Sequence, residues 1–535
     1  MTVARFHAAQ ERTGPLTMGQ ANMVRCVRTD PPEHMNYRVV RPLPPETTLT
    51  GLAEAAGLLL SRHESLRTLV REDTQHVLAS GELPVPVRDS ATPEESAEEL
   101  ARELQGARFE LVSEVPFRIA AVTSGGVPSQ VVLVTTHSAV DAIGLAVLLA
   151  DWDALILGKP LPPVTAPQPV DVAAAENGTA SRRRAEAALR YWETHLRRIP
   201  RSTLTVSVDD TDTEWLLPRL RVRSVAAAAA LRRITVRTGV SASAAVLAAL
   251  ATVTGLRAGA VTVPILSISA NRFRPELRDY VGPLAQDALV PVEIGADTFD
   301  AVLRGVRSAT LAAYQNSRFD ADALIRVMTD VQRERGVFFA RDIVFNDMSV
   351  PGQGGRVART DAGVHTTWLP EATLPTRMSL WVNRLEGELD FTLWADPRVL
   401  PRPDAQAAGE GLARLLIDAG TRDVPLADLA VEPVPRGPGW VRSDGCWTDL
   451  AEVRNLLPPG SEVVAVPDEE LGWRLVAYTV GQADRTPEDL HRACLAALPG
   501  RMSAMTPHHY VVCATAPRPG ERWEDQARLA EGSGR

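Results

Sequence analysis

Residues 130–153 constrain the fold of this chain most, because an apolar strand leads directly into a helix there. Residues 131–134 are three valines and one leucine, a run typical of a strand buried on both faces. From Ile143 onward the apolar residues recur with helical spacing. The sequence therefore predicts a buried strand followed by a helix, the unit from which α/β folds are built.

Polar residues lie at the junction between this strand and this helix. Ser138 is the expected N-cap, and Asp141 follows it at the spacing of a capping box. His137 is then placed at the end of a strand, beside a helix N-terminus. An imidazole in this position can take a proton from an attacking nucleophile, while the carboxylate fixes the local structure. The same short pattern also fits a structural histidine and a carboxylate favoured by the helix dipole, so the rest of the chain has to decide.

Composition excludes several classes of protein. A net charge of −9 and a pI near 5.7 argue against a general nucleic-acid binder. The N-terminus lacks the apolar core of a secretion signal, and residues 240–256 are too short and too weakly apolar for a membrane span. We therefore expect a reduced, cytoplasmic protein without a membrane or nucleic-acid partner. The four cysteines have no C-x-x-C spacing: Cys26, Cys446, Cys494 and Cys513.

Two proline-rich segments, residues 159–171 and 431–439, divide the chain. They predict an N-terminal domain over 1–170, a second domain over 171–432 and a small α+β domain over 440–535. Helices are expected over 16–28, 48–63, 97–104, 179–198, 226–238, 242–255, 307–330, 404–417 and 487–498. Strands are expected over 66–70, 116–122, 204–208, 220–225, 260–269, 378–382, 390–394, 462–466 and 475–480.

Several motifs in this order resemble the condensation-domain superfamily of nonribosomal peptide synthetases. The family's Arg-His-Glu-x-Leu-Arg-Thr motif is matched in full, and its catalytic His-His-x-x-x-Asp-Gly motif is matched in part. The resemblance covers most of residues 10 to 430. The matching segments are residues 16–24, 62–68, 136–142, 191–192 and 271–292.

The resemblance implies an α/β fold of two chloramphenicol-acetyltransferase-like lobes in a V shape, with the active site at their junction and the small α+β domain following. In the family the second histidine of the catalytic motif is the functional one, which is His137 here. The aspartate, Asp141, is structural and pairs with an arginine of the second lobe. We place that partner at Arg272, with Arg274 as the alternative.

Two positions depart from the family motif. Thr136 replaces the first histidine, and Ala142 replaces the glycine. Threonine can still form local hydrogen bonds, whereas the methyl group of Ala142 can narrow the substrate channel or restrict the backbone. His63 and Arg67 of the earlier motif are expected to be structural residues of the first lobe.

The reaction implied by the resemblance is attack of an amine, or less often a hydroxyl, on an acyl thioester in nonribosomal peptide or related natural-product biosynthesis. An acyl or peptidyl carrier protein delivers the thioester on its 4′-phosphopantetheine arm, so no bound cofactor and no metal are expected, and the chain is expected to act as a monomer. Two alternatives remain. One is a degenerate module that docks carrier proteins or partner enzymes, and the other is an acyltransferase with a soluble acyl-CoA donor.

The tail over residues 440–535 resembles the small C-terminal subdomain of adenylating enzymes. The large nucleotide-binding subdomain and the late catalytic lysine of that family are both missing, since Lys159 is the only lysine of the chain. We therefore expect the tail to dock a partner or to support the lobes. His508 and His509 are adjacent but have no third ligand at a useful spacing, so a loop or strand edge is expected there.

Overall fold

The computed structural model describes residues 2–204, 206, 215–349, 363–481 and 485–535, which form two compact units. The first unit comprises Met1–Ala188, Ser269–Gln286 and Ser317–Ala323. The second comprises Leu189–Ile268, Asp287–Asn316 and Leu324–Arg535. The domain boundaries expected near residues 170 and 432–440 stay predictions.

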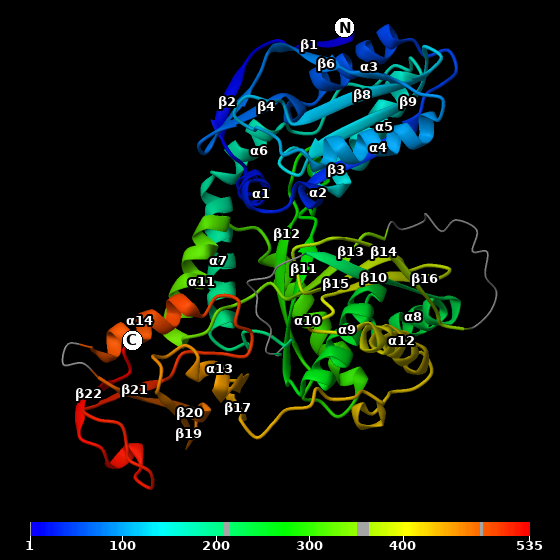
Figure 1. Ribbon diagram of the computed structural model, residues 1–535. Helices are drawn as coiled ribbons and strands as arrows, with labels where there is room; N and C mark the ends of the chain where they lie inside the picture. The colour runs from blue at the N-terminus through cyan, green and yellow to red at the C-terminus, as the bar shows by residue number, and fades with distance from the viewer. Residues whose placement is uncertain (1, 205, 207–214, 350–362, 482–484) are drawn as a thin grey trace. The chain divides into compact units, whose positions relative to one another are not determined.

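A four-stranded sheet in the order β3-β9-β8-β7 forms the centre of the first unit (Figure 1). Alternate residues of β9 contact different helices because successive side chains of a strand point to opposite faces. Val131 and Leu133 pack with α3 and α5, whereas Val132 and Val134 pack with α4 and α1. The strand is therefore buried on both faces, as its sequence predicts. The elements are β3 (Asn36–Pro42), β7 (Val87–Asp89), β8 (Phe117–Ser124), β9 (Val127–Thr136), α1 (Met18–Thr29), α3 (Leu49–Arg62), α4 (Pro93–Gly106) and α5 (Ala142–Ile156).

Two smaller sheets complete the first unit, one pairing β1 with β6 and one in the order β2-β5-β4. Helix α7 (Thr179–Leu196) begins in the first unit and contains residues of both units. The remaining elements are β1 (Thr2–His7), β2 (Arg12–Pro15), β4 (Thr68–Arg71), β5 (Thr74–Val77), β6 (Ser80–Val85), α2 (Pro32–Met35) and α6 (Pro169–Glu176).

The second unit contains a seven-stranded sheet in the order β12-β11-β13-β15-β16-β10-β14. Helices α8, α9, α10 and α12 cover one face of it and share its apolar core (Figure 1). The elements are β10 (Leu216–Ser224), β11 (Thr262–Ser269), β12 (Gln286–Glu293), β13 (Ile343–Asp347), β14 (His365–Thr373), β15 (Met378–Arg384), β16 (Leu389–Ala395), α8 (Val225–Thr238), α9 (Ala242–Ala258), α10 (Phe299–Gln315), α11 (Ala321–Arg335) and α12 (Arg402–Ala419).

Among the described residues, no single helix has the length and apolar composition needed to cross a membrane. Helices α8 and α9 meet these two criteria only when taken together, and a bend of 102° separates them. Both helices contribute side chains to the core of the second unit.

The single helix expected over residues 307–330 is wrong, because the structure contains two helices, α10 and α11, with a break after Gln315. The Ser317 hydroxyl donates to Asn271 Oδ1 at 2.7 Å, and Gln286 Nε2 donates to the Phe319 carbonyl at 2.9 Å. These tertiary hydrogen bonds hold residues 317–319 outside any helix, although helical spacing continues on both sides. The strand expected over 204–208 falls mostly outside the described residues, and Leu204 and Val206 lie in no strand.

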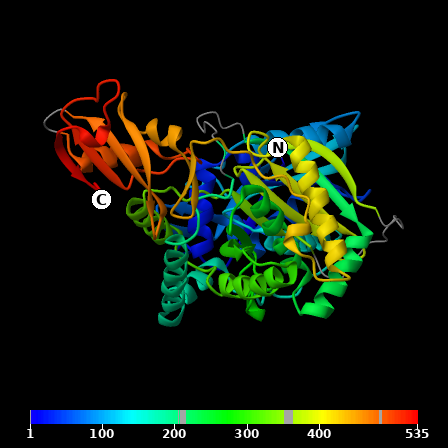
Figure 2. The same ribbon diagram turned by 90° about the horizontal axis from the view of Figure 1, so that it is seen from below.

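The tail forms a sheet of its own in the order β19-β20-β21-β22, beside a β17-β18 hairpin (Figure 2). Its core includes Val337, which precedes the tail in the chain by about a hundred residues. The tail is therefore packed onto the second unit. Its elements are β17 (Trp440–Ser443), β18 (Cys446–Asp449), α13 (Leu450–Arg454), β19 (Glu462–Asp468), β20 (Gly472–Val480), α14 (Pro487–Ala497), β21 (His509–Cys513) and β22 (Arg528–Gly532).

One buried arginine joins the tail to the C-terminal ends of α7 and α11. Arg335, at the end of α11, donates Nη1 to the carbonyls of Leu196 and Ile199 at 2.6 and 2.7 Å. Its Nε donates to Asp444 Oδ2 of the tail at 2.7 Å, and only 9% of the side chain is exposed. The same guanidinium thus bonds α7, the segment after it and the tail.

Arg335→Ala is expected to lower the free energy of unfolding by roughly 3 kcal/mol, because buried carbonyls and Asp444 lose their donor. Arg333→Ala is the matched control, since that side chain is 66% exposed and pairs with Asp330 at 3.6 Å. It is expected to change stability by less than about 0.5 kcal/mol. Urea unfolding of the full chain measures both. Equal unfolding curves for the two variants would contradict this account of the tail.

Candidate active site

Strand β9 places His137 one residue beyond its last ladder position. The His137 N–H donates to the Met35 carbonyl at 2.9 Å, so the backbone pairing with β3 extends to this residue. His137 lies on the same face as Thr135, two residues earlier. Tyr37 pairs with Thr135 across the ladder, and its ring centre lies 4.4 Å from that of His137. The imidazole is therefore held between a strand end and a tyrosine ring.

The surroundings of His137 keep its imidazole neutral. Burial lowers the pKa of His137 from 6.5 to about 4, while the negative charge of Asp141 and the backbone of Val140 oppose this shift. Its Nδ1 atom is buried and has no hydrogen-bond partner among the described residues. A neutral imidazole can accept a hydrogen bond at physiological pH.

This neutral state can be measured directly. Burial lowers the pKa of both His137 and His508 to about 4. In an NMR titration of the chain with its ten histidines labelled, two imidazoles are therefore expected to stay neutral down to about pH 5, and one of these two signals is expected to vanish in His137→Ala. His137 protonates more readily in the unfolded chain, where the ordinary pKa is about 6.5, so acidification from there toward pH 4 favours unfolding. A resonance that is lost in His137→Ala but titrates near pH 6.5 in the wild type would contradict the buried environment.

Asp141 is the N-cap of α5, and Ser138 is not. Asp141 Oδ1 accepts from the Gly144 N–H at 2.8 Å, and Oδ2 accepts from the Leu284 N–H at 3.0 Å. The expected cap at Ser138 is wrong because residues 137–139 form a turn first, and the N–H groups of Ala139 and Val140 donate to the Thr136 carbonyl. Because of this turn, helix α5 begins only at Ala142.

Arg272 makes an ion pair with Asp141. Its Nη2 lies 2.6 Å from Asp141 Oδ1, and the two side chains are only 7% and 5% exposed. Nη1 donates to the carbonyls of Leu277 and Tyr280 at 2.8 and 3.0 Å. Because both carboxylate oxygens of Asp141 are bonded, this residue fixes the local structure and is not free to act as a base. Arg274, the alternative partner, is half exposed and donates to Glu276 at 2.6 Å.

The two departures from the family motif have small structural consequences. Thr136 is fully buried and donates to the Met35 carbonyl at 3.5 Å. As the neighbour of His137 in an extended segment, it points toward the opposite face of the sheet. Ala142 is the first residue of α5 and has no positive φ, so the backbone there does not require glycine.

His63 and Arg67 bond within the first unit. His63 Nε2 lies 2.8 Å from Asp151 Oδ2 of α5, and both His63 and Arg67 are buried. Arg67 donates to the carbonyls of Leu60 and Leu78. These contacts support the strand and helix that carry the site.

Sequence reasoning missed the loop that presents Arg272. Asn271 has a φ of +54° and donates Nδ2 to the carbonyls of Leu284 and Ser317 at 2.9 and 3.0 Å. Tyr280 is fully buried, and a Cβ at Gly282 would lie 2.2 Å from its hydroxyl oxygen. Only glycine fits at 282 for this reason. The Asn-Arg pair and the Tyr-Val-Gly run were visible in the sequence, but not their mutual contacts.

Sequence reasoning also missed Tyr37. The residue lies on β3, for which the sequence predicted no strand, and it meets His137 only through the β3–β9 register. A tyrosine about a hundred residues away carries no local signal for that contact.

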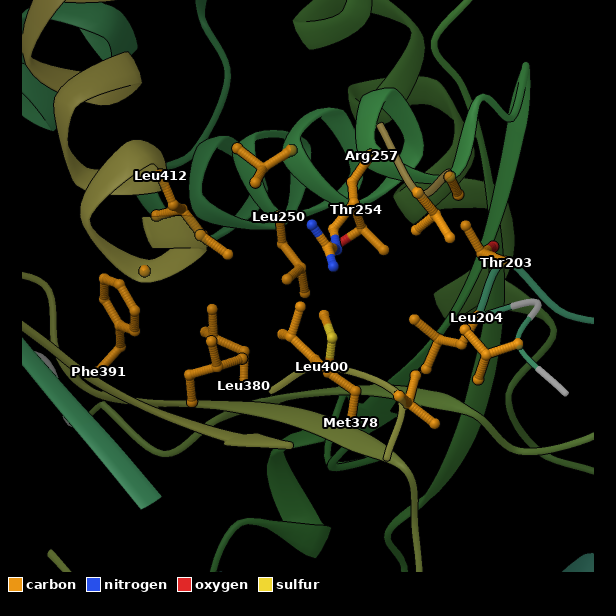
Figure 3. A pocket seen from close by; sticks show the side chains of 18 residues that line it. Thr203, Leu204, Leu250, Thr254, Arg257, Met378, Leu380, Phe391, Leu400 and Leu412 are labelled. Atoms are coloured by element: carbon orange, nitrogen blue, oxygen red, sulfur yellow. The ribbon is translucent and has the colours of Figure 1, made fainter. Parts of the chain in front are cut away.

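A narrow apolar cavity lies inside the second unit, between α9, α12 and strands β15 and β16 (Figure 3). About 580 Å³ of it is free of protein atoms, but only about 40 Å³ admits the centre of a water-sized sphere. Leu380 and Phe391 of the sheet face Leu250 and Leu412 of the helices. Its one charged side chain, Arg257, donates to Asp404 at 2.7 Å. Because its lining residues include no histidine and no carboxylate, this cavity is not the candidate active site.

A wider polar pocket lies in the first unit at the end of α6. About 470 Å³ of it admits the centre of a water-sized sphere. Its charged groups neutralise one another, since Arg318 lies 2.6 Å from Glu176 and Arg274 pairs with Glu276. We assign no chemistry to it.

The protein-family model of the condensation domain matches residues 10–362. The chain belongs to the condensation-domain family. The matched range includes His137, Asp141 and Arg272, so the three residues assembled in the first unit lie in the condensation domain itself.

Curated relatives of this condensation domain are far longer proteins. It is 26% identical over 452 residues to the nonribosomal peptide synthetase kk1B of Curvularia clavata, covering 78% of this chain and 3% of that protein. It is 26% identical over 295 residues to the probable non-canonical nonribosomal peptide synthetase CymA of Salinispora arenicola, covering 52% of this chain and 4% of that protein.

Solved structures share the fold of this condensation domain. The first condensation domain of the calcium-dependent antibiotic synthetase matches with a TM-score of 0.58 at 18% identity, covering 78% of this chain and 99% of that one. The X-domain from teicoplanin biosynthesis matches with a TM-score of 0.63 at 19% identity, covering 78% and 97%. These neighbours confirm the predicted α/β fold with chloramphenicol-acetyltransferase-like lobes. The resemblance of the tail to adenylating enzymes stays a prediction.

Proposed function

We propose that this chain is a condensation enzyme that transfers an acyl group from a carrier-bound thioester to an amine, or to a hydroxyl, and so forms an amide or ester bond. The observation that carries the proposal is the neutral, half-buried imidazole of His137, held at a strand end beside the Asp141–Arg272 ion pair. A docking module has no need of such a group. Membership of the condensation-domain family supports the same reaction class.

The roles follow from the contacts. His137 orders the incoming amine and takes up its proton as the nitrogen attacks the thioester carbonyl. Asp141 and Arg272 act on the helix start and the loop after β11, because all their named bonds are to each other or to backbone groups. They keep the strand end and α5 in place around the imidazole. The 4′-phosphopantetheine arm of the carrier protein supplies the acyl group and leaves as a thiol.

A docking role is the second candidate. One structural neighbour, with a TM-score of 0.64 at 18% identity, is an X-domain in complex with OxyB from teicoplanin biosynthesis. If this chain acted in that way, it would bind a carrier or an enzyme and leave the thioester intact.

The test separates these functions in one experiment. Carrier proteins loaded with different acyl thioesters are incubated with the full chain and with amines or alcohols, and products and remaining thioesters are measured by mass spectrometry. Parallel samples contain acyl-CoA in place of the loaded carrier, and carrier binding is measured separately. The proposal predicts amide or ester product that depends on the chain and on the loaded carrier. Binding with an intact thioester supports the docking function, and product from acyl-CoA alone supports the soluble donor.

A further inference from the structure

The acyl transfer proposed above needs a hydrogen-bond donor as well as a base. When the amine attacks, the electron pair of the carbonyl moves onto oxygen, and a donor aimed at that oxygen stabilises the charge. His137 faces the amine in this reaction and takes its proton. A second group must therefore face the oxygen.

Most polar groups around the imidazole are already bonded. Asp141 is an acceptor with both oxygens in use. The Thr136 hydroxyl donates to the Met35 carbonyl, and so does the His137 N–H. Arg272 Nη2 donates to Asp141 and to the Gly282 carbonyl, and Nη1 donates to the carbonyls of Leu277 and Tyr280. Arg272 Nε has no hydrogen-bond partner among the described residues, but this atom is fully buried. Apart from this buried Nε, none of these groups is free to donate to a substrate oxygen.

Tyr37 is in a different position. Its ring packs against the apolar core around α3 and α5 and contacts the imidazole at 4.4 Å between ring centres, tilted by 48°. No hydrogen bond joins its hydroxyl to a described residue, and the hydroxyl is not among the fully buried polar atoms. We propose that Tyr37 is a further catalytic residue, whose hydroxyl donates a hydrogen bond to the oxyanion formed during acyl transfer at His137.

The hydroxyl keeps its proton throughout this reaction. Burial raises the pKa of Tyr37 above its ordinary value, and the negative charge of Asp141 adds to the effect. Tyr37 is therefore a donor at neutral pH and not a second base. In the step itself, the amine nitrogen bonds to the carbonyl carbon, and His137 takes the proton from that nitrogen. The carbon–sulfur bond then breaks, and the thiolate receives the proton from His137, while Tyr37 retains its own.

This inference rests on the proposed acyl transfer and is tested with the same assay. Tyr37→Phe keeps the ring against His137 and removes only the hydroxyl. We expect kcat to fall about a hundredfold, the scale for losing one oxyanion donor, with KM for both substrates changed less than about twofold. Thermal unfolding is expected to be unchanged. Tyr478→Phe, in the tail, is the matched control with wild-type kinetics.

The outcomes are distinguishable. Wild-type turnover with an unchanged kcat in Tyr37→Phe would overturn the role of Tyr37 and leave the proposed function standing. A raised KM with an unchanged kcat would also overturn it, since the hydroxyl would then bind the ground state only. Ser138 follows His137 in the turn, and a loss of kcat in Ser138→Ala but not in Tyr37→Phe would assign the donor to Ser138 instead. A wild-type chain that makes no product overturns both proposals together.

Discussion

Arg272→Ala is expected to lower the free energy of unfolding of the first unit by about 3–5 kcal/mol. The size of the effect follows from burial, since the side chains of Arg272 and Asp141 are 7% and 5% exposed. Removing the guanidinium leaves the carboxylate without its counter-charge away from water. It also removes the donor to the Leu277 and Tyr280 carbonyls, so the loop is expected to open.

Arg274→Ala is the matched control, because this arginine is only two residues away, half exposed and paired with Glu276. Its effect is expected to stay within about 0.5 kcal/mol. Denaturant unfolding gives the stability, and hydrogen exchange of peptides from α5 and residues 271–284 locates the loss. The double variant Arg272→Ala/Asp141→Ala is expected to recover part of the stability lost in Arg272→Ala, because it leaves no unpaired buried charge. Equal free energies of unfolding for Arg272→Ala and Arg274→Ala would contradict the stabilising role of the buried Arg272–Asp141 pair.

The part of the site that follows from local pattern was predictable. Four apolar residues in succession indicated a strand buried on both faces, and β9 packs on helices from each side. The change to helical spacing near Ile143 indicated α5, which begins at Ala142. His137 at the strand end follows from these two elements alone. The start of the helix did not follow, because the turn over residues 137–139 uses backbone hydrogen bonds that no side-chain pattern reveals.

The part that depends on distant contacts was not predictable from spacing. Tyr37 meets His137 only through the register of β3 against β9. The break between α10 and α11 depends on hydrogen bonds that Ser317 and Phe319 make with Asn271 and Gln286, which lie outside that segment. The resemblance to condensation domains supplied Arg272 as the partner of Asp141, whereas composition and periodicity gave no reason to prefer it over Arg274.

His137→Ala is expected to lower the rate of acyl transfer at least about a hundredfold, the lower end of the contribution of a positioned general base. The reason is that the imidazole at the strand end is placed to accept the proton of the amine, and burial, which lowers its pKa to about 4, keeps it neutral at working pH. The fold is expected to survive, since the backbone N–H of residue 137 still donates to the Met35 carbonyl.

His7→Ala is the matched control for this variant. His7 is exposed at the end of β1, its backbone N–H donates to the Ser61 hydroxyl, and its imidazole makes no hydrogen bond to a described residue. It is expected to transfer acyl groups at the wild-type rate. Thermal unfolding of both variants shows whether any loss of activity comes from the fold.

The most direct test of a condensation enzyme acting through His137 is a single-turnover transfer measured side by side for wild type, His137→Ala and His7→Ala. A loaded carrier protein is mixed with excess chain and amine, and the acyl product is quantified by mass spectrometry over time. The account predicts product from wild type and His7→Ala at equal rates, and at least about a hundredfold less from His137→Ala. Equal rates for all three chains would contradict it.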